Sequence, residues 1–200
     1  MDSFALSFAA NSLILEQTHD KYGRVKIRIM SQKSKPHKQH KAVADSLEVE
    51  AVANFCIEMA KKERIPLTHL KLQKLVYIMH GWHLAEFKKP LVNEEPEAWE
   101  YGPVFKSLYH ALKIYSSDNI KQPIGLPRGD SFEFPEISKT KYRDSLEFLK
   151  EVWDAYKDAT AGELVGATHR EGTPWSDAYK SGKRNPRISN ESIKKYYLSL

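Results

Sequence analysis

Hydrophobic residues are densest between Leu70 and Ala85, where they occur on almost every side of the helix that this stretch predicts. A helix without a polar face is one that other elements cover on all sides. Thr68 is suited to cap the start of this helix, and the Lys-Lys-Pro sequence at 88–90 ends it. We therefore expect a central, buried helix around which the rest of the fold is arranged.

Two amphipathic helices are predicted next to the central one in sequence. Ser46 is a suitable N-cap for a helix over residues 47–63, whose apolar residues recur at helical spacing. After the central helix comes a short hairpin-like connection through residues 91–101. Gly102 frees the backbone for a sharp turn, and Pro103 suits the first position of a helix because its missing N–H would be unpaired there. That helix should reach about residue 115 and bury Phe105, Leu108, Tyr109 and Leu112.

The helical pattern is lost between residues 116 and 140, where proline and glycine recur. This stretch predicts a long surface connection with short extended pieces. Helical spacing of apolar residues returns over residues 141–157. Thr160 and Glu163 then fit a capping box, in which a hydroxyl and a carboxylate each accept a free N–H, and that helix should end near His169.

Two further helices are predicted near the C-terminus. Thr173 followed by Pro174 is typical of the start of a short helix. Ser189 is suited to cap a terminal helix, with Ile188 and Ile193 packed together as a hydrophobic staple. These helices complete a fold that we expect to be mainly α.

The N-terminal part of the chain has a different pattern. Val25, Ile27 and Ile29 alternate with basic residues, and this period of two predicts a β-hairpin with residues 13–18 around a turn at Gly23. An isolated hairpin is only marginally stable and needs a surface on which to lie.

The hairpin is followed by a polar stretch, residues 31–41, with too little apolar content to fold by itself, which predicts a flexible linker. The expected organisation is a basic N-terminal extension, residues 1–45, and a single compact helical domain, residues 46–200. Met30 stands at the junction between the hairpin and the linker, and a translation start there would make the segment before it dispensable. Intact mass of the natively expressed protein would distinguish Met30 from Met1.

Composition and charge refine this picture. Two hundred residues with 41% hydrophobic content can build one core. The net charge is +5, yet residues 1–45 hold eight Lys and Arg against four Asp and Glu, so the remainder carries only +1. The basicity therefore belongs to the extension, which could bind nucleic acid electrostatically but shows no helix-turn-helix pattern and little aromatic interleaving.

The sequence predicts a protein of the cytoplasm with no membrane association. No stretch approaches the roughly 20 apolar residues that span a bilayer. The apolar run at residues 4–15 lacks the basic start of a signal peptide. The one cysteine, Cys56, stands among apolar residues, where a buried, inert thiol is the expected state.

Several motifs recur together in one stretch and near the C-terminus. They are Leu70-Lys71-Leu72-Gln73-Lys74-Leu75 with Tyr77, His80-Gly81-Trp82, Ala98-Trp99, Tyr101-Gly102-Pro103-Val104, Tyr109, Thr168-His169 and Pro174-Trp175. In combination they closely resemble the Panacea domain, a family also described as SocA-like or related to the phage-associated protein GepA. The resemblance extends from about residue 47 to the C-terminus.

The resemblance implies an antitoxin that neutralises a partner toxin by binding it; some members instead deliver the toxin to the ClpXP protease. It also marks a set of family-motif residues with structural roles: Leu72, Gln73, Leu75, Tyr77, His80, Trp82, Gly102, Pro103, Tyr109, His169 and Trp175.

Catalytic chemistry finds little support in the sequence. His80 and His83 lie three residues apart, but the usual zinc pattern of two histidines four apart with a glutamate between them is absent. His169 could act as a base with a hydroxyl or Cys56 as nucleophile, yet no nucleophile elbow and no phosphate-binding glycine loop is present. We expect no catalytic residue, no metal and no cofactor.

Aromatic residues beside lysines are the candidates for partner binding, since these residue types dominate interface hot spots. Trp82 and Tyr109 are expected in the core, whereas Trp99 and Tyr101 lie on a short connection where they can be exposed. The partner-binding candidates are Lys71, Lys74, Trp99 and Tyr101, together with Val25, Ile27 and Ile29 of the extension.

The function expected from these observations is that of a cytoplasmic, bacterial or phage-encoded antitoxin that covers the active surface of its toxin. The helical domain would supply the platform, while the extension and the connection at 116–140 would adapt it to one toxin. The nearest alternative is an adaptor for ClpXP. From other classes, an enzyme built around His80 or His169 and a DNA-binding repressor using the basic extension stay open.

Overall fold

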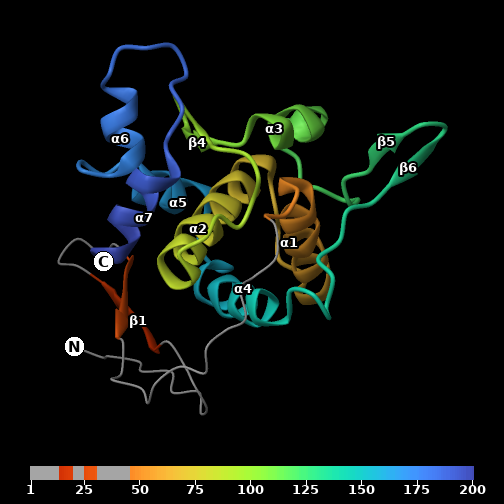
Figure 1. Ribbon diagram of the computed structural model, residues 1–200, viewed down its shortest axis with the longest axis horizontal. Helices are drawn as coiled ribbons and strands as arrows, with labels where there is room; N and C mark the ends of the chain where they lie inside the picture. Colours follow the sequence, from red (N-terminus) through yellow and green to blue (C-terminus); the bar gives the residue numbers. More distant parts are fainter. Residues whose placement is uncertain (1–13, 20–24, 31–45) are drawn as a thin grey trace. The chain divides into compact units, whose positions relative to one another are not determined.

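The computed structural model describes residues 14–19, 25–30 and 46–200 (Figure 1). The chain divides into two compact units, residues 1–42 and residues 43–199. The predicted linker at 31–41 and the turn at Gly23 lie outside the described residues.

Helices dominate the described residues, as the sequence predicts. They are α1 (Val49–Glu63), α2 (His69–Phe87), α3 (Lys106–Leu112) with the short 3-10 helix η1 (Lys113–Tyr115), α4 (Arg143–Tyr156), α5 (Ala161–Thr168), α6 (Pro174–Tyr179) and α7 (Asn190–Leu198). The strands form three antiparallel pairs: β1 (Ile14–His19) with β2 (Val25–Met30), β3 (Glu97–Trp99) with β4 (Gly102–Val104), and β5 (Leu126–Arg128) with β6 (Ser131–Glu133).

The first unit contains the expected hairpin. Strands β1 and β2 pair antiparallel, with Ile14 opposite Met30 and His19 opposite Val25. Strand β1 begins at Ile14, within the predicted range, and Val25, Ile27 and Ile29 all lie in β2.

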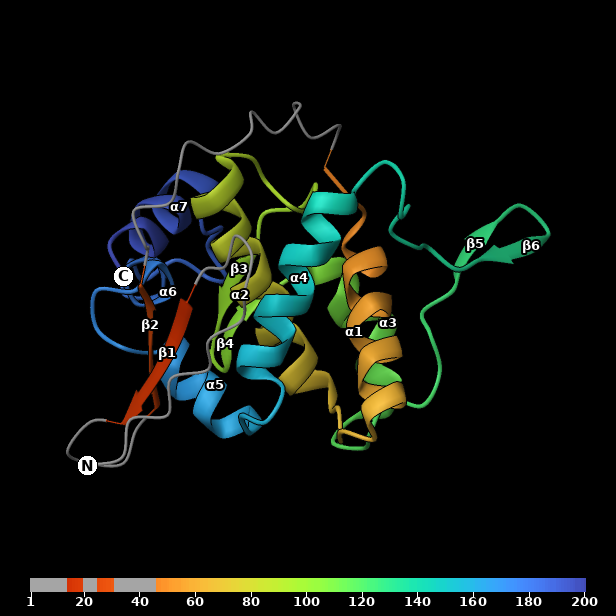
Figure 2. The same ribbon diagram turned by 90° about the horizontal axis from the view of Figure 1, so that it is seen from below.

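Helix α2 is the central element of the second unit, as predicted. Fifteen of its nineteen residues are buried, and it packs against α1, α4, α5 and α7. In Figures 1 and 2, α1 lies on one side of α2 and α7 on the other. The Thr68 hydroxyl accepts a hydrogen bond from the backbone N–H of Lys71 at 3.3 Å, which confirms the predicted cap.

The start of α1 differs from the prediction. Leu47 is extended, because its N–H donates to the carbonyl of Leu91 at 2.8 Å and its carbonyl accepts from the N–H of Asn93 at 2.9 Å. The helix therefore begins at Val49, and Ser46 is not its cap. Pairing with a distant segment overrides the local capping signal.

The start of α3 also corrects the sequence analysis. Pro103 does not begin a helix, because Gly102–Val104 is β4 and pairs with β3. The helix begins at Lys106, and its N-terminal N–H groups are capped by the carboxylate of Glu94, which accepts from Lys106 at 2.6 Å and from Ser107 at 3.2 Å. A carboxylate suits this end of a helix because the helix dipole is positive there.

The connection between α3 and α4 is anchored to the helices at defined points. Asn54 of α1 accepts from the N–H of Ile124 at 2.7 Å, and its amide donates to the carbonyls of Ile124 and Pro135, both at 3.0 Å. Between these anchors the chain forms the β5–β6 hairpin, which projects away from the helices (Figures 1 and 2). The predicted extended pieces are thus present.

The capping signals near the C-terminus are confirmed. Thr160 and Glu163 form both bonds of the capping box at the start of α5. Thr173 caps α6 and Ser189 caps α7. None of the helices in the described part of the chain combines the length and the apolar character that crossing a membrane requires.

Candidate functional site

The β3–β4 hairpin covers Lys74 of α2. Gly102 has a φ of +100°, a backbone conformation that residues other than glycine rarely adopt. A Cβ atom at this position would lie 2.7 Å from Cε and 2.9 Å from Nζ of Lys74. Gly102 is therefore required both by the turn, as predicted, and by the close approach of the hairpin to α2.

Lys74 lies in the interior with a relative exposure of 0%. Its Nζ donates to the carbonyl of Pro103 at 2.9 Å, and burial lowers its pKa to about 7. Lys71 is also buried, and its Nζ donates to the carbonyl of Lys157 at 2.6 Å. Desolvation by burial lowers the pKa of Lys71, although Asp158 and Glu163 oppose this effect.

Both of these partner-binding candidates are buried. Lys71 and Lys74 lie on a helix that is covered on nearly all sides, so their side chains run inward to backbone carbonyls. In this conformation Lys74 offers no surface to a partner. Its visible role is to hold the β3–β4 hairpin on α2.

Two histidines flank Lys74. The pKa values of His69 and His169 are both lowered, first by burial and second by the positive charge of Lys74. Their Nε2 atoms are buried without a hydrogen-bond partner within the described residues. His169 stacks on Trp175 with ring centroids 3.7 Å apart and an interplanar angle of 6°, and His69 contacts Tyr109 at 5.2 Å.

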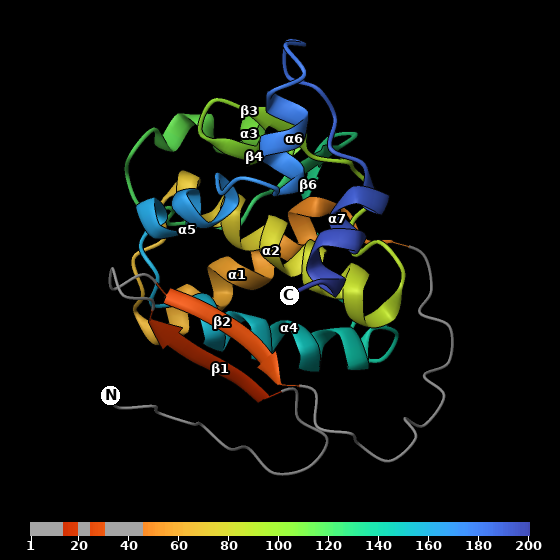
Figure 3. The same cartoon turned by 90° about the vertical axis from the view of Figure 1, so that its left-hand side faces the viewer.

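Strands β3 and β4 and helices α3 and α6 lie together (Figure 3). Aromatic rings from these elements contact one another. Trp175 stacks on Tyr179 with centroids 4.8 Å apart, and its Nε1 donates to the carbonyl of Trp99 at 2.8 Å. Trp99 in turn contacts Tyr109 at 4.8 Å. We call Trp99, Tyr101, Tyr109 and Tyr179, together with the buried Trp175, the aromatic surface.

The rings of the aromatic surface differ in their exposure. Tyr101, at the turn between the strands, is 63% exposed, and Tyr179 is 45% exposed. Trp99 and Tyr109 are half-buried, which places Tyr109 at the rim and not in the core as expected. Tyr179 was missed by the sequence analysis, although its spacing four residues after Trp175 on a short helix places both on one face.

The remaining family-motif residues lie inside the domain. Leu72, Leu75, Tyr77 and Trp82 are buried, and the Trp82 indole donates to the Tyr156 hydroxyl at 3.0 Å.

Gln73 bonds one backbone position twice. Its amide donates to the carbonyl of Phe105 at 3.1 Å, and its oxygen accepts from the N–H of Phe105 at 3.0 Å. This pair of bonds fixes the chain between β4 and α3.

His80 and His83, the pair considered for metal binding, have structural partners on both ring nitrogens. His80 Nε2 lies 2.7 Å from Oδ1 of Asn190, and its Nδ1 accepts from the N–H of Val92 at 3.4 Å. His83 Nδ1 lies 3.0 Å from the carbonyl of Lys89, and its Nε2 lies 3.2 Å from the Ser145 hydroxyl. Burial lowers the pKa of each to about 4, so both rings are neutral at physiological pH.

Among the residues whose placement the structure describes, no three His, Cys, Asp or Glu side chains are grouped so that they could hold a metal ion. Cys56 is fully buried, its Sγ lies 3.6 Å from Sδ of Met79, and burial raises its pKa. A nucleophilic thiol needs the opposite shift. What the aromatic surface offers is exposed rings and hydroxyls, which is the chemistry of protein recognition.

A comparison with known proteins places the chain in a family. The family model described as Antitoxin SocA-like, Panacea domain, matches residues 72–176, more than half of the chain. The chain belongs to this family of SocA-like antitoxins, as the motifs indicate. Antitoxin SocA of Caulobacter vibrioides (strain NA1000 / CB15N) is 33% identical over 133 residues, which cover 65% of this chain and 69% of that protein. No solved structure matches the chain.

Family membership supports an antitoxin role, which implies a toxin as partner and favours a function without catalysis. The matched segment includes Lys74, the β3–β4 hairpin and Trp175, and it ends three residues before Tyr179. Val25, Ile27 and Ile29 belong to the first compact unit, and their role in partner binding stays a prediction.

Proposed function

We propose that this protein is a cytoplasmic antitoxin that neutralises one toxin stoichiometrically, by direct binding through its aromatic surface. The observation that carries the proposal is the exposure of Tyr101 and Tyr179 on a rigid platform within a SocA-like antitoxin. Exposed tyrosines supply large contact area at a low cost in conformational entropy.

The elements that carry these tyrosines, the β3–β4 hairpin and α6, are joined to each other, which explains why the tyrosines can act as anchors. Trp99 and Trp175 are joined by the 2.8 Å bond from the Trp175 indole to the Trp99 carbonyl. Strand β3 is held on its other side by the segment before α7, since the N–H of Ala98 donates to the carbonyl of Pro186 at 2.8 Å. A surface that is already ordered loses little entropy on binding.

The test is co-expression of the full chain with the product of its neighbouring gene, with growth rescue and co-purification as the two readouts. Rescue with a stable complex supports direct neutralisation. Rescue without a complex that disappears in a ClpXP-deficient strain would replace the proposal with the adaptor mechanism. No toxicity and no association would contradict it.

The aromatic surface is tested by Tyr101→Ala and Tyr179→Ala, each expected to weaken toxin binding by about 1–3 kcal/mol because anchor tyrosines dominate interfaces. Binding is measured by isothermal titration with the purified toxin. Phe132→Ala is the matched control, since Phe132 is 70% exposed but lies on β6 in the projecting hairpin. Equal affinity for all four proteins would remove the aromatic surface from the interface.

We also propose that the extension, residues 1–45, contributes specificity for one toxin through Val25, Ile27 and Ile29 of β2. Deletion of residues 1–45 is then expected to weaken toxin binding while leaving the helical domain folded.

If the protein is instead a repressor that binds DNA through the extension, the full chain retards its promoter DNA in a gel at physiological salt, and deletion of residues 1–45 abolishes that retardation.

A further inference from the structure

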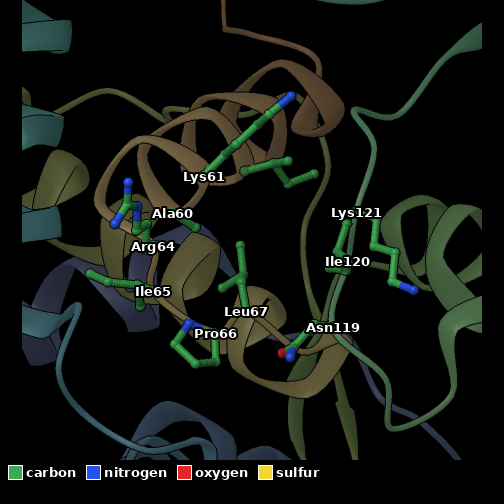
Figure 4. Close-up of a pocket in the computed structure, with 10 residues that line it drawn as sticks. Ala60, Lys61, Arg64, Ile65, Pro66, Leu67, Asn119, Ile120 and Lys121 are labelled. Carbon is green, nitrogen blue, oxygen red and sulfur yellow. The ribbon is translucent and has the colours of Figure 1, made fainter.

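A groove of about 370 Å³ lies at the C-terminal end of α1. It is bounded by the last turns of that helix, by the connection to α2 and by residues 119–121 (Figure 4). In Figure 4 the side chain of Leu67 lies in the middle, with Ile65 on one side and Ile120 on the other. Its volume is at the small end of the range typical of ligand sites.

The walls of the groove are fixed by backbone hydrogen bonds. The N–H of Ile120 donates to the carbonyl of Leu67 at 2.9 Å, and Thr68 forms an antiparallel bridge with Asn119. On the opposite wall, the N–H of Ile65 donates to the carbonyl of Ala60 at 2.9 Å. The groove is thus part of the folded framework.

Its floor is apolar and its rim is cationic. Ile57 and Leu67 are buried at the bottom, while Ile65 and Ile120 are half-exposed. The charged residues of the lining are Lys61, Arg64 and Lys121; all three are exposed, and none of the described residues that line the groove is acidic.

The three rim cations make no ion pair within the described residues. Other basic residues on this domain do: Lys157 pairs with Glu63 at 2.8 Å, and Lys180 pairs with Glu171 at 2.9 Å. The rim therefore presents three uncompensated positive charges around an apolar floor.

Arg64 is held in an unusual conformation. It ends α1 with a φ of +58°, the left-handed conformation that glycine most often adopts after a helix. Its N–H donates to the carbonyls of Ala60 and Lys61. An arginine at this position carries a backbone cost that a glycine would not. Replacing Arg64 by glycine therefore removes the side-chain charge without straining the backbone, which makes this charge a property that can be tested.

We propose that this groove binds an acidic segment of the toxin, with one or two apolar side chains on the floor and Asp or Glu residues facing Lys61, Arg64 and Lys121. The inference rests on the proposed antitoxin function and names a second contact surface, formed by other elements than the aromatic surface. Charge complementarity selects this occupant, because a basic or neutral peptide would leave the rim unpaired. An apolar floor without converging donors is unsuited to phosphate.

The first test uses the full chain and the toxin encoded by the neighbouring gene. The triple variant Lys61→Glu, Arg64→Glu, Lys121→Glu is expected to bind the toxin on the order of tenfold more weakly, chiefly through slower association, with a reduced dependence on salt. The matched control is Lys139→Glu, Lys150→Glu, Lys195→Glu, which makes the same charge change at other exposed lysines. The control is expected to keep wild-type affinity.

Arg64→Gly separates recognition from folding. Glycine relieves the positive φ, so the variant is expected to melt at the wild-type temperature or above it while binding the toxin a few-fold more weakly. Ile65→Ser and Ile120→Ser test the floor, and they are expected to speed dissociation of the complex with little effect on association.

Four outcomes would contradict the proposal that the groove binds an acidic segment of the toxin. If the triple variant and its control have equal affinity while the wild type binds and rescues, the toxin does not use the groove, and the proposed function stands. If the wild type retards RNA or DNA in a gel and the triple variant does not, the occupant of the groove is a nucleic acid. If Arg64→Gly binds the toxin with wild-type affinity, the positive charge of Arg64 does not contribute to toxin binding. If the wild type does not bind the toxin, the proposed function and the groove fail together.

Discussion

Lys74 shows how a single residue can couple stability to pH. Its pKa of about 7 in the folded protein lies below the ordinary value of 10.5, because burial disfavours the charged ammonium. Between these two values the unfolded chain binds more protons than the folded one. The free energy of unfolding should therefore rise with pH across this window.

We expect the wild type to gain up to roughly 1.4 kcal/mol of stability per pH unit from this residue between pH 7 and 9.5. Lys74→Met should remove that part of the slope, because methionine fills a similar volume without a charge. Urea unfolding at a series of pH values measures it. An unchanged slope in the variant would show that Lys74 is not the group responsible.

Gly102 permits a test of the close approach between the hairpin and α2. Gly102→Ala combines a positive φ with a Cβ placed against Lys74 and should cost about 2–4 kcal/mol. Gly129→Ala is the control, since Gly129 also has a positive φ, of +60°, but its Cβ would meet nothing within 4 Å. Its cost should be near 1 kcal/mol. Equal losses would mean that the hairpin yields to the added methyl group.

At the scale of elements, the capping residues that correctly predicted helix starts are those whose hydrogen-bond partners lie close in sequence. Thr160, Thr173 and Ser189 cap their helices because each bonds an N–H three residues later. Ser46 and Pro103 fail as helix starts for one shared reason. Their segments are engaged by strand-like pairing with residues 91–93 and 97–99, which no local pattern reveals.

Asn54 holds the connection between α3 and α4 in place, and it does so across 70 and 81 residues of sequence. Asn54→Ala would leave the buried N–H of Ile124 and two carbonyls without their partner, at a cost of about 2–4 kcal/mol. The connection should also become more sensitive to proteolysis between Ile124 and Pro135. Asn93→Ala, at an exposed position, is the control for both thermal unfolding and limited proteolysis. Equal cleavage rates would show that other contacts hold the connection.

At the scale of the whole molecule, α2 is tied to two helices through buried neutral histidines. His80 contacts Asn190 at the start of α7, and His83 contacts Ser145 of α4. Their pKa values of about 4 lie below the ordinary 6.5. The unfolded chain takes up protons first as pH falls, so stability should be lost between pH 6.5 and 4.

The expected loss is roughly 1.4 kcal/mol per pH unit for each histidine. His83→Gln should be less stable than the wild type at neutral pH but should lose less on acidification. His110→Gln, at an exposed position on α3, should follow the wild-type curve. Thermal unfolding from pH 7 to 4 measures all three proteins, and parallel curves for His83→Gln and the wild type would exclude this origin.

The candidate site was predictable in part. Gly102 predicts a sharp turn, and this places Trp99 and Tyr101 on a short connection where they can be exposed. The sequence motifs indicate the family. The burial of Lys74 does not follow, because it depends on how closely β4 approaches α2. The groove beside Arg64 was also beyond sequence reasoning, since its walls come from segments more than fifty residues apart.

The contact between Lys74 and Gly102 also has a consequence for how such sequences can diverge. The long side chain at position 74 occupies the space that any Cβ at position 102 would enter. A lineage that replaces Gly102 must therefore move, shorten or remove the side chain at 74, and a smaller residue at 74 relaxes the steric part of the requirement for glycine. Substitutions at positions 74 and 102 should therefore be correlated among related chains.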